Sequence, residues 1–166
     1  MELKTERLLI RSWQESDVDR YAEIINNPLV MKYIGSGNIQ DYEYAKKFIS
    51  TVMSLEKERR WTLWVVENKY NNDLMGFCGF ATWQNNIEIG WRLDNIYWRR
   101  GYGTEAAMAV LDFGKKAFSF PKIVSIAQKP NIASIRIMQK IGLEFEQKII
   151  DERCNRKIVV YAKSYP

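Results

Sequence analysis

Residues 98–106 read Trp-Arg-Arg-Gly-Tyr-Gly-Thr-Glu-Ala, and a helical pattern of apolar residues begins directly behind them. Glycine lacks a Cβ atom, so Gly101 and Gly103 allow the backbone to turn sharply and to approach a ligand closely. The first N–H groups of a helix have no partner within the helix, and the helix dipole makes that end partly positive. Together with the cations Arg99 and Arg100, this stretch predicts an anion site, most often one for phosphate.

The composition limits the class of protein that carries this site. A length of 166 residues fits one domain, and 46% hydrophobic residues suffice for one core. The net charge of +5 is modest, and the basic residues are interleaved with 20 acidic ones, so we expect no nucleic-acid partner. Residues 1–6 lack the apolar core of a signal peptide, and no segment approaches the roughly 18 apolar residues of a membrane span. We therefore expect a cytoplasmic protein with no membrane partner.

The chain contains no histidine and only two cysteines, Cys78 and Cys154, which do not stand in a metal-binding spacing. We expect no metal, because zinc sites draw mainly on cysteine and histidine. The absence of histidine also removes the commonest general base and every Ser-His or Cys-His nucleophile pair. Any acid–base chemistry must therefore come from Asp, Glu, Tyr, Lys, Cys or water.

Apolar periodicity and turn residues predict a mixed α/β (α+β) domain around one sheet, with the element order βααβββαβαββ. The two turns at 71–73 and 84–86 join three of the strands into an antiparallel meander. The predicted strands are 7–13, 61–67, 74–83, 87–93, 122–128, 144–152 and 157–163, and the predicted helices are 18–25, 41–58, 101–118 and 131–141.

The glycines also match the dinucleotide-binding fingerprint, as Gly101-x-Gly103-x-x-Ala106. That fingerprint follows a strand immediately in a βαβ unit, and an acidic residue ends the next strand. Here residues 94–100 separate the glycines from the preceding strand, which belongs to a hairpin, and the next strand ends at Gln128 without a carboxylate. A P-loop is excluded too, since no Gly-Lys-Ser/Thr follows. The context therefore disfavours a nicotinamide enzyme.

A second segment, residues 131–143, reads Asn-Ile-Ala-Ser-Ile-Arg-Ile-Met-Gln-Lys-Ile-Gly-Leu and opens the next predicted helix. With Thr-Glu-Arg-Leu-Leu-Ile-Arg at 5–11 and Glu-Ile-Gly-Trp at 88–91, it makes the chain resemble the GCN5-related N-acetyltransferase (GNAT) superfamily. Its RimJ/RimL-like branch, the ribosomal-protein N-terminal acetyltransferases, is the most similar in pattern. The resemblance implies a single acyl-CoA N-acyltransferase domain over 1–166, with a mostly antiparallel, twisted central sheet and helices on both faces.

The resemblance implies that acetyl-CoA is the acetyl donor and that the glycine loop holds its pyrophosphate. The family signature Q/R-x-x-G-x-G/A falls on 98–103, with Trp98 in the place of Gln or Arg, as in the RimJ/RimL branch. Asn131 matches the asparagine that contacts the pantetheine arm, and the backbone of Trp91, Arg92 and Leu93 would pair with the pantetheine amides like an added strand. The predicted pyrophosphate donors are the backbone N–H groups of Arg99, Arg100, Gly101, Tyr102, Gly103 and Thr104.

Two residues are the catalytic candidates. Alternation along 87–93 places Glu88 on the face opposite Ile87 and Ile89. On an exposed sheet face it would be an ordinary solvated carboxylate, whereas under covering helices it would line a groove and take a proton from an amine. Ser134 matches a serine near the thioester sulfur. Many relatives carry a proton-donating tyrosine where this chain has Met138, so Ser134 or a water is the predicted donor to the leaving thiolate.

These observations predict an acetyl-CoA-dependent N-acetyltransferase that moves the acetyl group directly to a primary amine. The alternative is a CoA-binding regulatory module that has lost catalysis. The acceptor stays open between a protein N-terminus and a small-molecule amine, with residues 26–58 expected to form part of its site. A monomer and a homodimer are both compatible with the pattern.

Overall fold

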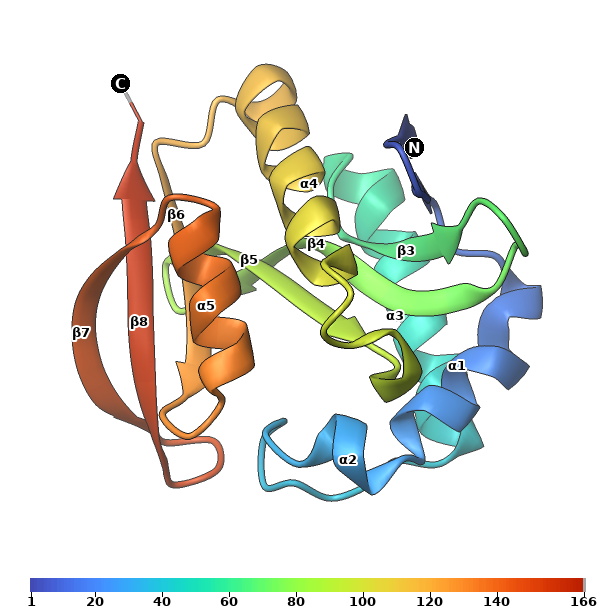
Figure 1. Ribbon diagram of the computed structural model, residues 1–166, viewed down its shortest axis with the longest axis horizontal. Coiled ribbons are helices and arrows are strands. Elements are labelled where there is room, and N and C mark those ends of the chain that lie inside the picture. The colour runs from blue at the N-terminus through green and yellow to red at the C-terminus, as the bar shows by residue number, and fades with distance from the viewer. Residues whose placement is uncertain (166) are drawn as a thin grey trace.

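The computed structural model describes residues 1–165, which build one sheet of eight strands in the order β1-β2-β3-β4-β5-β6-β8-β7 (Figure 1). The strands are β1 (Glu2–Lys4), β2 (Leu8–Arg11), β3 (Leu63–Asn68), β4 (Leu74–Trp83), β5 (Asn86–Leu93), β6 (Lys122–Gln128), β7 (Glu144–Asp151) and β8 (Arg156–Ser164). The helices are α1 (Val18–Ile25), α2 (Pro28–Met31), α3 (Tyr42–Arg59), α4 (Tyr102–Phe118) and α5 (Ile132–Lys140), with short 3-10 turns η1 (Glu15–Asp17) and η2 (Asn95–Tyr97).

Strands β5 and β6 form the one parallel pair among the described strands, and this pair is short. Its register joins Ile87 to Ile123 and Glu88 to Val124, and stops there. Beyond Glu88, β5 continues to pair with β4 as far as Leu93. Figure 1 shows β5 running obliquely away from β6. The sheet therefore opens into a fork, with Glu88 at the point where the two strands part.

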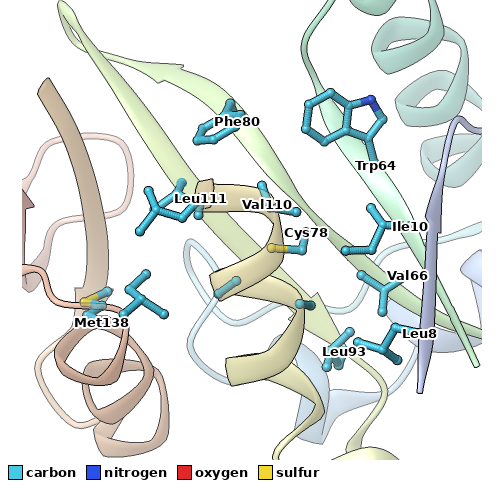
Figure 2. Close-up of a cluster of buried hydrophobic side chains, with 14 of the residues drawn as sticks. Leu8, Ile10, Trp64, Val66, Cys78, Phe80, Leu93, Val110, Leu111 and Met138 are labelled. Atoms are coloured by element: carbon cyan, nitrogen blue, oxygen red, sulfur yellow. The ribbon is translucent and has the colours of Figure 1, made fainter. Parts of the chain in front are cut away.

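Helices cover both faces of the sheet, as predicted. Strands β3 and β4 are therefore buried on both sides. Trp64 of β3 belongs to a core cluster that includes residues of α4 and α5, several of which are drawn in Figure 2. Its neighbour Val65 belongs to a second cluster, with residues of α1 and α3. This alternation is the period-2 pattern of a strand buried on two faces. The mixed α/β prediction and its mostly antiparallel sheet are confirmed.

The structure adds elements that the periodicity did not predict. Strand β1 is three residues long and pairs only with β2, so it carries too little pattern to be recognised. The predicted first strand, 7–13, is shorter in the structure and ends at Arg11. Pro28 follows the end of α1 but also begins α2, where the side chain of Asn27 caps the N–H of Leu29. Proline is favoured at the first helical position because its missing N–H would have no partner there.

No helix within residues 1–165 has both the length and the apolar character that crossing a bilayer requires.

Candidate active site

The glycine loop forms the N-terminal end of α4. Gly101 is the N-cap residue of this helix and adopts a left-handed backbone with φ +82°. The first helical bond runs from the N–H of Glu105 to the carbonyl of Gly101 at 3.0 Å. The N–H groups of residues 102–104 therefore have no acceptor within the helix. This geometry fits an anion held by backbone donors, as the sequence predicted.

Hydrogen bonds from side chains of the N-terminal segment hold this loop in place. Glu105 accepts from the Nε of Arg7 at 2.7 Å and from the hydroxyl of Thr5 at 2.6 Å. The Nη1 of Arg7 donates to the carbonyl of Arg100 at 2.9 Å, and its guanidinium lies 4.2 Å from the ring centre of Tyr102. Residues 5–11 carry part of the sequence resemblance, but their contact with the glycine loop depends on the tertiary structure.

Arg7→Met is expected to raise the KM for acetyl-CoA about tenfold, since charge-assisted hydrogen bonds hold the Arg100 carbonyl and Glu105 in place. The KM for the acceptor should change little. Arg11→Met is the matched control from β2, the strand that follows Arg7 directly, because Arg11 pairs with Asp17 and Glu67 and does not contact the loop. Steady-state kinetics with both substrates provide the check. Equal effects of the two variants on the acetyl-CoA KM would show that Arg7 acts only through general stability.

Gly103 has a packing role that the sequence did not reveal. A Cβ atom at this position would lie 2.9 Å from Cδ1 of Ile137 in α5. The missing side chain at Gly103 therefore lets α4 approach α5 closely. This contact lies beside the glycine loop. Trp98 also has a defined contact, since its indole N–H donates to the carbonyl of Leu93 at 2.8 Å. The aromatic residue at the first signature position thus ties the loop to the end of β5.

The fork leaves the backbone of β5 beyond Glu88 without a partner on the β6 side in residues 1–165. Trp91, Arg92 and Leu93 lie on this unpaired edge, where an extended ligand could add as a strand. The side chains of Trp91 and Leu93 pack toward α4, and that of Arg92 lies on the opposite face, against α1. The carbonyl of Leu93 already accepts the indole N–H of Trp98, so one lone pair of this oxygen is in use.

Asn131 and Ser134 are brought together at the start of α5. The Oδ1 of Asn131 caps the helix by accepting the N–H of Ser134 at 3.2 Å. This cap is the ordinary structural role of an asparagine at this place. It uses the side-chain oxygen, and no bond from the amide nitrogen of Asn131 is found within the described chain. Met138 is fully buried in the core on the α4 side, so a packing residue occupies the place of the tyrosine of many relatives.

Glu88 is partly buried at the fork, on the face away from α4. Burial raises the pKa of its carboxyl group to about 7; the positive charge of Arg153 opposes this shift and the negative charge of Asp151 adds to it. Arg153 and Asp151 lie at the turn between β7 and β8 and pair with each other at 2.7 Å. Glu88 is therefore not a freely solvated carboxylate, and it can exchange a proton near neutral pH.

The loop after α2 is hydrogen-bonded to the end of β6. The side-chain amide of Gln128, at the end of β6, donates to the carbonyl of Gly35 at 2.7 Å. Part of the region 26–58 is thereby tied to β6, the strand that borders the fork. Sequence periodicity could not reveal this contact, because the two residues are far apart in the chain. Residues 1–165 bring together no group of three or more His, Cys, Asp or Glu side chains that could hold a metal ion.

The acetyltransferase (GNAT) domain model matches residues 7–144. The chain belongs to the GNAT family of acetyltransferases. It is 33% identical over 148 residues to the uncharacterized N-acetyltransferase YnaD of Bacillus subtilis (strain 168), covering 88% of this chain and 84% of that protein. The protein is thus an enzyme of the N-acetyltransferase class.

Solved structures agree with the GNAT assignment. A GNAT-family acetyltransferase from Bacillus anthracis superposes with a TM-score of 0.86 at 29% identity, covering 99% of this chain and 98% of that one. RimL, the ribosomal L7/L12 alpha-N-protein acetyltransferase solved with coenzyme A, also reaches 0.86, with 99% and 98% covered. Its identity to this chain is 14%, so this second likeness concerns the fold alone.

Proposed function

We propose that this GNAT enzyme transfers the acetyl group of acetyl-CoA directly to a primary amine. The observation that carries the proposal is the fork between β5 and β6, with Glu88 at its apex and the N-terminus of α4 beside its β5 edge. In this proposal the pyrophosphate lies on the backbone donors of 99–104. The pantetheine arm pairs with Trp91, Arg92 and Leu93 and contacts Asn131.

In the proposed reaction, the Glu88 carboxylate takes a proton from the acceptor ammonium, directly or through a water. The free amine then attacks the thioester carbonyl, the C–S bond breaks, and the nitrogen loses its second proton as the amide forms. Ser134 or a water passes this second proton to the departing thiolate, and Glu88 releases the first proton to solvent before the next turnover. Positioning of the two substrates supplies a large part of the rate, and no covalent enzyme intermediate is required.

Several finer assignments belong to the same proposal. The whole chain, 1–166, forms one acyl-CoA N-acyltransferase domain. The aromatic Trp98 supports a place in the RimJ/RimL-like branch. A cytoplasmic location would give the enzyme access to acetyl-CoA. The acceptor is a primary amine, either a protein N-terminus or a small molecule.

Acetyl-CoA is expected to raise the melting temperature, whereas NAD should leave it unchanged. A ligand at about 100 times its Kd adds about 2.7 kcal/mol of stability, because it binds only the folded protein. For a domain of this size that corresponds to a shift of roughly 5–10 °C. Differential scanning fluorimetry with each nucleotide is the measurement. A shift with NAD and none with acetyl-CoA would contradict the proposed donor.

The alternative is a member of the GNAT family that binds CoA without turnover, and it is compatible with the buried Met138 at the position where many relatives carry a proton-donating tyrosine. Both candidates bind CoA, so the thermal shift does not separate them. Release of free thiol from acetyl-CoA in the presence of a broad panel of amines does. Turnover with any amine supports the enzyme, and a saturable thermal shift without turnover supports the binding module.

A further inference from the structure

Arg92 and Glu88 share one strip of the sheet. Both side chains lie on the face of β5 away from α4, separated by Gly90, and four residues along a strand span roughly 13 Å. A Cβ atom added at Gly90 would meet nothing closer than the Oε1 of Glu88, at 3.9 Å. The strip between the carboxylate and the guanidinium is therefore open, and its floor is backbone.

Arg92 forms no salt bridge with any carboxylate among residues 1–165, and its contacts are to neutral groups. Its Nη1 donates to the hydroxyl of Tyr21 at 3.1 Å, and its guanidinium lies 5.2 Å from the ring centre of Phe77. Its Nε is buried and has no hydrogen-bond partner. The Nη2 of Arg92 forms no hydrogen bond within residues 1–165 and, unlike the Nε, is not buried, so Nη2 is the donor that a ligand can reach.

Other arginines near this sheet are paired differently. Arg7 bonds to Glu105, Arg11 to Asp17 and Glu67, and Arg20 to Asp73 and Asp94. Each of these structural arginines faces a carboxylate within the fold. Arg92 instead meets a neutral hydroxyl and an aromatic ring. Arg153, whose charge also acts on Glu88, is paired with Asp151, so a carboxylate of the fold already balances its charge.

We infer that Arg92 binds an anionic group on the acceptor, so that the acceptor is an amine that also carries a carboxylate or a phosphate. This inference rests on the proposed function, because it assigns the amine end of the acceptor to Glu88. The planar guanidinium suits carboxylate and phosphate oxygens, which it can bind through two parallel hydrogen bonds. The phosphates of acetyl-CoA are assigned to the N-terminus of α4, which covers the opposite face, so they do not compete for Arg92.

The test compares ω-amino carboxylates, from glycine to aminohexanoate, with diamines of equal length, in the thiol-release assay. The wild type should prefer the amino carboxylate at its best length by about tenfold to a hundredfold in kcat/KM, the range expected for a hydrogen bond to a charged group. Arg92→Gln should remove this preference, and Arg92→Lys should keep part of it. Phosphoethanolamine against β-alanine distinguishes phosphate from carboxylate. Equal selectivity in the wild type and Arg92→Gln would overturn the inference.

Arg59 provides the matched control. Its Nε is also buried without a partner, and its guanidinium lies 3.9 Å from the ring centre of Trp61. It sits at the end of α3, however, where its Nη1 donates to Thr82, and Thr82 pairs with Ile87 on the other face of the sheet. Arg59→Gln should leave the selectivity unchanged. If both glutamine variants lower selectivity alike, the loss reflects general packing and the inference fails.

A binding measurement separates this inference from the proposed function. The Nε–Hε signal of Arg92 in a proton–nitrogen NMR spectrum, assigned by its loss in Arg92→Lys, should shift on titration with aminohexanoate. The matched diamine should leave it in place, and the signal of Arg59 is the internal reference. Absence of thiol release with every amine would sink the proposed function, while the titration would still decide the anion site. If neither an amino carboxylate nor phosphoethanolamine shifts the Arg92 signal selectively, the inference about the anion site is overturned.

Discussion

Glu88→Gln is expected to lower kcat/KM for the amine acceptor by about 10²–10⁴-fold, the usual contribution of a general base. The wild-type rate should rise with pH through about 7, because burial raises the pKa of Glu88 to about 7 and only the carboxylate accepts a proton. This limb of the profile should vanish in the variant. The KM for acetyl-CoA should stay nearly unchanged, since Glu88 lies on the face away from the glycine loop. Thiol-release kinetics across pH 6 to about 9 provide the measurement.

The same variant should be more stable than the wild type above neutral pH. A carboxyl group whose folded pKa is raised holds its proton in the folded state while the unfolded chain releases it, so the wild type loses stability as pH rises from 4.5 to about 7. Glutamine does not titrate, so the variant avoids this loss. The difference in the free energy of unfolding should be on the order of 1–3 kcal/mol after allowance for the partial exposure of Glu88. Urea unfolding below and above this window measures the difference.

Glu144→Gln is the control for both effects. Glu144 also lies on a strand, at the start of β7, but its side chain is exposed. Its replacement should change neither the pH profile nor the stability. If Glu88→Gln leaves the profile intact as well, Glu88 is not the base and a water or another group must accept the proton.

Gly101→Val is expected to weaken acetyl-CoA binding by about a hundredfold or more. The left-handed φ of +82° suits glycine and is an outlier for a β-branched residue, which would force the loop to change shape. Its Cβ would also lie 3.3 Å from the Nη2 of Arg7, which supports the loop. The backbone donors that we propose for the phosphates would then no longer converge. Isothermal titration with CoA measures the loss.

Gly142→Val controls for backbone strain. Gly142 has the same φ of +82°, but it follows α5, and a Cβ there would meet only Lys163, at 3.5 Å. Both variants should lose stability, by about 1–2 kcal/mol or more for the left-handed position. Only Gly101→Val should lose CoA affinity disproportionately. Equal affinities in the two variants would place the phosphate site elsewhere, and Gly101→Ala serves if the valine variant does not fold.

Much of the fold followed from local pattern. The alternation along 87–93 predicted correctly that Ile89 and Glu88 lie on opposite faces of the sheet, because side chains of a strand alternate by geometry. The helix behind Gly101 and the hairpins around 71–73 and 84–86 were predicted by residues whose conformational preferences are local. Short pieces such as β1 and α2 were missed, because three or four residues hold less than one period of any pattern.

The sequence alone predicts an anion site at the glycine loop of 98–106, since glycines and a helix start act within a few residues. The tertiary structure decided what surrounds it. Four features of the site depend on segments that are distant in the chain. They are the parting of β5 and β6, the hydrogen bond from Arg7 to the loop, the burial of the Glu88 carboxyl group and the unpaired guanidinium of Arg92. Burial and charge compensation are properties of the assembled fold, so no local pattern of residue types could determine them.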